Sequence, residues 1–197
     1  MSRPERSFFE GDTLELARRL LGCTLWHAAP DGLTAGRIVE TEAYCGETDA
    51  AAHSYKRRAP DGRTSVMYGP GGFAYVYLIY GMHCCMNIVC APAGTPHAIL
   101  LRALEPVEGI ALMRARRKRE KDTELCSGPG KLCAAMGIDR ACYGQDLLGD
   151  TLWLTLGRPV PAREIVSTGR VGVDYAGEAA NYPWRFYIDG NPHVSVK

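Results

Sequence analysis

In the segment 37–44, acidic and phenolic side chains occupy every second position from residue 40 onwards. Glu40, Glu42 and Tyr44 lie two residues apart in this segment. In a β-strand, alternate side chains point to the same face of the sheet, so these three would lie side by side. A carboxylate held in a cleft can act as the general base that takes a proton from water. A solvated strand face is the commoner explanation for an isolated strand, and the spacing alone leaves both open.

A single arginine within an apolar run favours a catalytic cleft. Arg102 lies within residues 99–104, whose other members are Ile, Leu and Ala. A buried guanidinium group is costly unless it is paired, so Arg102 should contact a carboxylate. The candidates are Glu40, Glu42 and Glu105, and the sequence does not choose among them. An arginine paired with a glutamate in a cleft could hold and polarise a water molecule.

Aromatic residues cluster just before a predicted hairpin turn. Tyr75 and Tyr77 would share one strand face, and we expect Tyr75 to fill the core. Tyr80 and Met82 flank Gly81 at the tip, where they have no obvious core to enter. Proteins that bind the minor groove insert such exposed apolar side chains between base steps. The tip is therefore a candidate DNA wedge.

Flat rings elsewhere could build a pocket for a base. Tyr44, Tyr77 and His53 could stack on a flipped nucleobase. His53 belongs to residues 45–70, a long segment rich in turn formers, and long ordered loops are often functional. Asn87 is a lone polar residue in an apolar strand, for which an internal hydrogen bond to the backbone is the simplest explanation.

Metal chemistry is poorly supported by the sequence. Glu47, Asp49 and His53 are a conceivable metal set, but no second cluster of carboxylates and histidines accompanies them. The eight cysteines contain no Cys-x-x-Cys pair, so we expect them to be small buried residues and expect no metal and no other cofactor. A Gly-x-Ser-x-Gly elbow and a Walker loop are both missing.

Composition indicates a soluble globular chain. The 197 residues are 46% hydrophobic and 23% charged, and the longest apolar runs fall far below the roughly 20 residues that a membrane span needs. The first residues lack the apolar stretch of a secretory signal, so we expect a reducing compartment, the cytoplasm and nucleoid if the source is bacterial. The net charge is only +1, and on charge alone the basic clusters at 56–63 and 114–121 favour solvated faces over phosphate contacts.

Hydrophobic periodicity and turn residues predict more strands than helices. Asp12 and Glu15 resemble a capping pair, Pro106 suits the first turn of a helix, and Gly137 suits a helix end. The predicted helices cover residues 13–21, 106–121 and 129–136. The predicted strands cover 23–28, 34–44, 73–80, 83–90 and 98–104. We expect the α+β class: a single domain over residues 1–197, with a curved, largely antiparallel sheet and flanking helices.

Several segments resemble, in order, those of the alkyladenine (3-methyladenine, methylpurine) DNA glycosylases. They are residues 36–44 (GRIVETEAY), 49–54 (DAAAHS), 75–82 (YVYLIYGM), 85–88 (CMNI), 100–106 (LLRALEP) and 125–129 (LCSGP), with 170–173, 185–187 and 194–196 towards the end. The resemblance implies one mixed domain with a protruding hairpin that inserts into DNA, and no metal.

The resemblance also implies a role for each matched residue. Glu42, rather than Glu40, corresponds to the general base that activates water, and Arg102 to the arginine that helps to hold it. The rings of Tyr44, His53 and Tyr77 correspond to those that line the base pocket. Asn87 corresponds to the pocket residue that crowds the exocyclic amine of normal guanine. Tyr80 corresponds to the side chain that fills the gap in the minor groove, with Met82 beside it.

The implied activity is base excision repair. The enzyme would flip alkylated or deaminated purines (3-methyladenine, 7-methylguanine, hypoxanthine, etheno-adenine) out of double-stranded DNA and hydrolyse the N-glycosidic bond. The motifs place no lysine as a Schiff-base nucleophile, so we expect a monofunctional enzyme that leaves an abasic site. We also expect the protein to be a monomer. The alternatives are a non-catalytic nucleic-acid-binding module of the same fold and a metal-dependent nuclease or deaminase.

Overall fold

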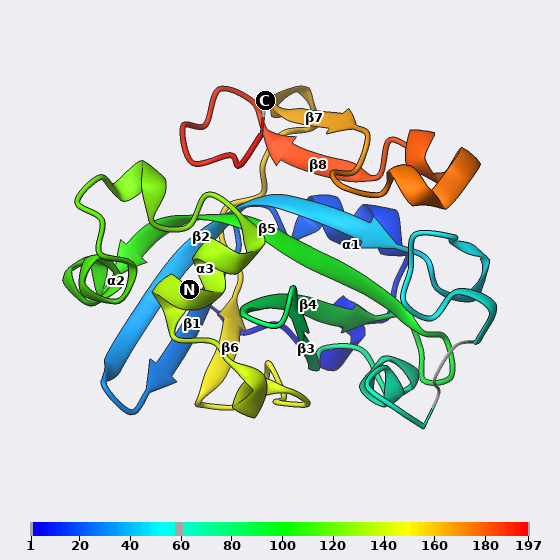
Figure 1. Ribbon diagram of the computed structural model, residues 1–197, viewed down its shortest axis with the longest axis horizontal. Helices are drawn as coiled ribbons and strands as arrows, with labels where there is room; N and C mark the ends of the chain where they lie inside the picture. Colours follow the sequence, from blue (N-terminus) through cyan, green and yellow to red (C-terminus); the bar gives the residue numbers. More distant parts are fainter. Residues whose placement is uncertain (1, 58–60, 197) are drawn as a thin grey trace.

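Two long strands form the middle of the sheet in the computed structural model, which describes residues 2–57 and 61–196. β2 (Gly32–Tyr44) and β5 (His97–Glu108) pair antiparallel along most of their length (Figure 1). The sheet continues in the order β3-β4-β5-β2-β1-β6, and β8 pairs with both β2 and β7. Every strand pair is antiparallel, which confirms the expected largely antiparallel α+β sheet.

The remaining elements are short. The other strands are β1 (Thr24–Ala29), β3 (Ala74–Ile79), β4 (His83–Cys90), β6 (Leu152–Thr155), β7 (Ile165–Thr168) and β8 (Arg185–Ile188). The α-helices are α1 (Thr13–Arg19), α2 (Ile110–Arg117) and α3 (Pro129–Met136). Short 3-10 helices cover Arg6–Phe9, Gly46–Thr48, Tyr55–Arg57, Ser65–Tyr68, Asp122–Glu124, Arg140–Cys142, Ala162–Glu164 and Asp174–Asn181.

On the side of β2 away from β5, two different strands pair with it. β1 pairs with Gly32–Arg37, whereas β8 pairs with Glu40–Glu42, and the register of β2 shifts between these two parts. Such a bulge re-aims the side chains that follow it. The change of partner therefore places Glu42 between Leu100 of β5 and Arg185 of β8.

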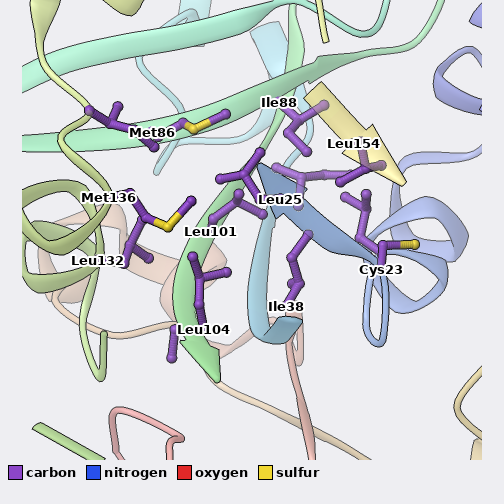
Figure 2. Packing of buried hydrophobic residues seen from close by; sticks show 14 of the residues in the cluster. Cys23, Leu25, Ile38, Met86, Ile88, Leu101, Leu104, Leu132, Met136 and Leu154 are labelled. Atoms are coloured by element: carbon purple, nitrogen blue, oxygen red, sulfur yellow. The ribbon is translucent and has the colours of Figure 1, made fainter. Parts of the chain in front are cut away.

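Apolar side chains from distant segments fill the main core. Figure 2 shows Leu25 and Ile38 packed near Leu101, with Leu132 and Met136 of α3 beside Met86. The cysteines Cys23, Cys85, Cys90, Cys126, Cys133 and Cys142 are buried, as expected for small apolar residues, while Cys45 and Cys84 are half-buried. Burial raises the pKa of all eight thiols.

Local signals locate two of the three helices well. Asp12 accepts a hydrogen bond of 2.8 Å from the amide of Glu15 and so caps α1, which ends two residues earlier than predicted. α3 matches its predicted range, and Gly137 ends it with a φ of 69°.

The predicted helix over 106–121 is wrong in its first turn, and it also extends past the observed end at Arg117. β5 runs through Pro106 to Glu108, and α2 begins only at Ile110, after Gly109 with a φ of 68°. The ladder between β2 and β5 is irregular here, because Ala35 pairs with Glu108 and Gly36 with Pro106. A bulge tolerates a proline that cannot donate a ladder hydrogen bond, so long-range pairing overrides the local preference.

Four of the six basic residues at 114–121 lie within ion-pair distance of a carboxylate. Arg114 pairs with Asp122 at 3.0 Å, Arg116 pairs with Asp31, and Arg119 lies 3.7 Å from Glu124. This pairing favours a solvated face over a phosphate-binding one. Within the described residues, no helix has the length and apolar character that a membrane crossing requires.

Candidate active site

A cavity of about 510 Å³ opens where the ends of the long strands meet two loops. The loops are the segment after β2 and the segment before the 3-10 helix at Asp174–Asn181, which lie side by side at the right of Figure 1. The size is typical of a site for a small organic group. The lining includes all the predicted pocket rings, two arginines and a buried amide: Tyr44, His53, Arg63, Tyr75, Tyr77, Tyr80, Asn87, Arg102, Val171 and Tyr175.

The carboxylate of Glu42 lies directly behind this wall. Its Oε1 accepts a hydrogen bond of 2.7 Å from the amide of Val171 and lies 3.3 Å from Nη1 of Arg102. Its Oε2 accepts a hydrogen bond of 2.8 Å from the hydroxyl of Tyr44. All three partners line the cavity, while the Glu42 side chain is fully buried. These contacts fix the direction of the carboxylate.

Glu40 has different surroundings from Glu42. It accepts hydrogen bonds from Nε of Arg102 at 3.2 Å, from Nε of Arg185 at 2.7 Å, and from the amide and hydroxyl of Ser195 at 2.6 and 3.0 Å. It therefore ties β2 to β8 and to the C-terminal segment.

Arg102 bridges the two glutamates. It is 7% exposed, and it contacts Glu40 through Nε and Glu42 through Nη1. The prediction that this arginine is buried and paired is confirmed. Glu105, the third candidate partner, binds Arg37 and Asn191 instead. Arg102 therefore contacts two different environments. Its Nε binds Glu40, which ties strands together, and the residue also lines the cavity beside Glu42.

Aromatic rings form one side of the cavity. The rings of His53 and Tyr77 meet edge to face, with centroids 4.6 Å apart, and those of Tyr75 and Tyr77 are 5.3 Å apart. Nδ1 of His53 lies 2.8 Å from the hydroxyl of Tyr75. Tyr75 is 2% exposed, which confirms its expected place in the core. Its hydroxyl nevertheless orients a cavity residue, which strand parity alone did not indicate.

Burial keeps the cavity rings uncharged at neutral pH. Desolvation raises the pKa of Tyr44, Tyr75 and Tyr77, and the neighbouring Glu42 raises that of Tyr44 further. Desolvation, and then the nearby Arg63, lowers the pKa of His53 to about 4. The phenols therefore remain donors, and the imidazole remains neutral.

Asn87 lies on β4 opposite Tyr75 and borders the cavity. Its Nδ2 donates a hydrogen bond of 3.2 Å to the carbonyl of Tyr75. The expected bond to the backbone is confirmed, and it holds the amide at the cavity wall.

The hairpin between β3 and β4 carries its apolar residues at the tip. Tyr80 is 85% exposed and Met82 is 73% exposed. The turn closes with a hydrogen bond of 3.3 Å from the Met82 amide to the Ile79 carbonyl. Both central residues have positive φ, 52° for Tyr80 and 71° for Gly81, as in the primed turns of tight hairpins. A non-glycine residue in this region is strained, so a tyrosine here is not the residue that local stability prefers.

The conceivable metal set does not converge. Both oxygens of Asp49 bind the guanidinium of Arg170, at 2.6 and 2.9 Å, and His53 is hydrogen-bonded to Tyr75. The described part of the chain contains no group of three or more His, Cys, Asp or Glu side chains arranged to hold a metal ion.

Sequence reasoning did not predict the contacts of several residues at the site. Arg170 and Asp49 form a buried pair behind Tyr44, Val171 binds Glu42 through its amide, and Tyr175 stands 72% exposed at the cavity. The argument used for Arg102 could have found one of them, since any buried arginine needs a carboxylate partner. A backbone amide such as that of Val171 leaves no signal in residue type.

Comparisons with known proteins identify the family of the chain. The model of the family described as Methylpurine-DNA glycosylase matches residues 7–192. Proteins from Bacillus cereus strains B4264 and G9842 are 49% and 50% identical to the chain over 204 residues, and one from Bacillus thuringiensis strain Al Hakam is 48% identical. Each alignment covers 97% of this chain and 98% of the relative, whose provisional name is 3-methyladenine DNA glycosylase. The chain therefore belongs to the methylpurine-DNA glycosylase family.

Proposed function

We propose that this protein is a monofunctional DNA glycosylase of base excision repair. It removes alkylated or deaminated purines from double-stranded DNA by hydrolysis and leaves an abasic site. The observation that carries the proposal is the position of Glu42, a carboxylate held by two hydrogen bonds and one ion pair directly behind the wall of a ring-lined cavity. The chemistry that suits this arrangement is activation of one water beside a bound base.

The damaged base binds in the cavity, outside the helix. A stacked base cannot reach a carboxylate that is buried behind Tyr44 and Arg102, so the nucleotide must be flipped. Tyr44, His53 and Tyr77 supply the flat surfaces against which it stacks. The neutral state of His53 suits this role, because a cationic imidazole would repel an alkylated, positively charged purine.

Glu42 activates the water, and Arg102 and the Val171 backbone orient it. A carboxylate offers about four acceptor positions, and Glu42 accepts two hydrogen bonds and pairs with Arg102, which leaves an acceptor position for a water. Glu42 takes the proton as the water attacks the sugar carbon. Its negative charge also stabilises the positive charge that develops on the sugar as the base departs.

The wall residue Asn87 provides selection. Its amide is fixed by the Tyr75 carbonyl and cannot easily move aside. It therefore crowds the 2-amino group of normal guanine, which 3-methyladenine, hypoxanthine and etheno-adenine lack. 7-Methylguanine, the fourth candidate substrate, keeps this group, but its base is cationic. Cationic alkylated bases leave readily, so catalysis matters most for the neutral lesions.

Tyr80 and Met82 act on the duplex. Their exposed side chains at the hairpin tip enter the minor groove, and Tyr80 fills the gap that the flipped nucleotide leaves. Flipping costs a few kcal/mol, which stacking of inserted and pocket rings can offset.

A hydrolytic, single-step enzyme is favoured over one that also cuts the strand. Among the described residues that line the cavity there are arginines but no lysine to form a Schiff base. The product should therefore be an intact strand that breaks only after alkali treatment.

The deciding experiment uses a panel of duplexes, each with one lesion, scored for released base. The wild type should release base from at least one of them, and Glu42→Gln should bind the same duplex but release none. Release at the wild-type rate by Glu42→Gln would remove this residue from the mechanism. If the wild type binds but releases nothing from the whole panel, the protein is a non-catalytic binding module.

Base release in excess EDTA distinguishes the proposed metal-free mechanism from a metal-dependent nuclease or deaminase. The proposed mechanism predicts the same rate of base release with and without the chelator. Loss of activity in EDTA, restored by added metal, would contradict it.

A further inference from the structure

A fully buried ion pair lies behind the cavity wall. Arg170 and Asp49 are joined by two bonds, Nη1 to Oδ2 at 2.6 Å and Nη2 to Oδ1 at 2.9 Å, and both side chains are 0% exposed. Neither residue is among those that line the cavity. The pair therefore acts on the site only through other residues.

Arg170 fastens the end of β2 to the loop that follows β7. Its guanidinium donates to the carbonyls of Ala43 and Ala179, both at 2.9 Å. It also lies over two rings, 4.8 Å from the centroid of Tyr44 and 5.1 Å from that of Trp184. One side chain thus holds the backbone between Glu42 and Tyr44 and one face of the Tyr44 ring.

Asp49 shapes the loop after β2 in the same way. Besides binding Arg170, its carboxylate accepts hydrogen bonds from the amides of Cys45 at 3.1 Å and Ala51 at 3.0 Å. The pair consequently joins β2, the loop that leads to His53, and the segment that begins at Arg170.

Both hydrogen bonds that Glu42 accepts depend on this junction. Val171, whose amide binds Oε1 of Glu42, follows Arg170 directly in the chain. Tyr44, whose hydroxyl binds Oε2, packs against the Arg170 guanidinium. A shift of Arg170 would therefore move both donors at once.

Stability alone does not explain the arrangement. A buried ion pair often contributes little net stability compared with apolar residues of the same volume. Nε of Arg170 is also buried and finds no hydrogen-bond partner within the described chain, a cost that a purely stabilising contact would avoid.

We propose that Asp49 and Arg170 are a positioning pair, which sets the distance and direction of the Glu42 carboxylate relative to the cavity. This inference rests on the proposed function, because it assigns the pair to the water-activating step. The pair touches neither base nor water. It acts by keeping the Val171 amide and the Tyr44 hydroxyl on Glu42 while the nucleotide enters.

The test is a double substitution that removes both charges, Asp49→Asn with Arg170→Met. Asparagine keeps an acceptor for one of the two loop amides, and methionine fills the space of the arginine stem between the rings. Removing only one partner would leave a buried unpaired charge and could prevent folding. The double variant avoids that outcome.

Excision is measured in single turnover with saturating enzyme, and duplex affinity is measured in the Glu42→Gln background. We expect the double variant to lose about 100-fold in the excision rate, the scale of a small misplacement of catalytic groups, with unchanged affinity. Arg170→Lys keeps the charge but cannot reach Asp49 and both carbonyls together, so its rate should fall between those of the wild type and the double variant.

Leu154→Ala is the matched control, since Leu154 is a fully buried core residue on β6 that does not line the cavity (Figure 2). It should lower the melting temperature and leave the excision rate unchanged below the transition. A double variant that excises at the wild-type rate, or loses rate only as far as it is unfolded, would overturn the positioning role alone. A wild type that releases no base would overturn the proposed function, and the positioning role with it.

Discussion

The hydroxyl of Tyr44 donates a hydrogen bond of 2.8 Å to Oε2 of Glu42, two residues earlier on the same strand face. Strand geometry alone brings these two side chains together. Tyr44 therefore has two proposed roles, one for its ring against the base and one for its hydroxyl on the carboxylate.

Tyr44→Phe separates those roles. The ring remains, so affinity for a lesion-containing duplex should stay near that of the wild type. Loss of one donor loosens the carboxylate, and we expect the single-turnover excision rate to fall about 10-fold, the scale of one hydrogen bond to a charged group. A larger loss of affinity than of rate would contradict this division.

Glu40→Gln and Glu42→Gln should behave in opposite ways. Glu40 compensates two buried arginines, Arg102 and Arg185, so Glu40→Gln should cost about 3–5 kcal/mol of unfolding free energy. Glu42→Gln leaves Arg102 paired with Glu40 and should cost less stability while it abolishes base release. Denaturant unfolding and excision assays on both variants check the prediction. Equal stability losses, with Glu40→Gln inactive when fully folded, would argue that Glu40 shares the catalytic role.

Tyr80→Ala tests the wedge. The side chain is 85% exposed, so the unfolding free energy should change little. Affinity for a lesion-containing duplex should fall about 10-fold or more, while affinity for the free base should not change. Val107→Ala is the control, because Val107 is also exposed, at 47%, but does not line the cavity. Similar losses for the duplex and the free base would count against the wedge.

Acid should destabilise the fold partly through His53. Burial lowers the pKa of this imidazole from 6.5 to about 4, so between these pH values the unfolded chain binds a proton that the native protein does not. The contribution of His53 to stability is therefore complete above about pH 6.5 and is lost as the pH falls towards 4. The measurement is unfolding free energy across this range.

His53→Gln should flatten that pH dependence. Some slope should persist in His53→Gln, because burial also lowers the pKa of His97. Identical pH profiles for His53→Gln and the wild type would show that His53 titrates normally in the native state.

Much of the site was accessible from local patterns. Strand parity placed Glu40, Glu42 and Tyr44 on one face, and turn chemistry placed Tyr80 and Met82 at an exposed tip. These features depend on neighbours within a few residues, which is the range over which periodicity and turn preference act.

Long-range contacts were accessible only in part. Because Arg102 lies among apolar residues, the sequence predicts that it pairs with a carboxylate. The sequence does not show that Arg102 contacts two carboxylates, those of Glu40 and Glu42. The helix start predicted at Pro106 is wrong because the place of Pro106 in β5 depends on a long-range contact, its pairing with β2, about 70 residues away in the sequence.

By itself, the sequence determined the residue types, the face of β2 that carries the carboxylates, the hairpin and the family. Only the tertiary structure decided that Glu40 binds Arg185 and Ser195, while Glu42 lies behind the cavity wall and binds Tyr44, Arg102 and Val171, which line it. It also decided that Asp49 pairs with Arg170 and that the Val171 amide meets Glu42. The physical reason is that a buried charge binds the donors that packing brings near it, and here those donors lie more than 100 residues away along the chain.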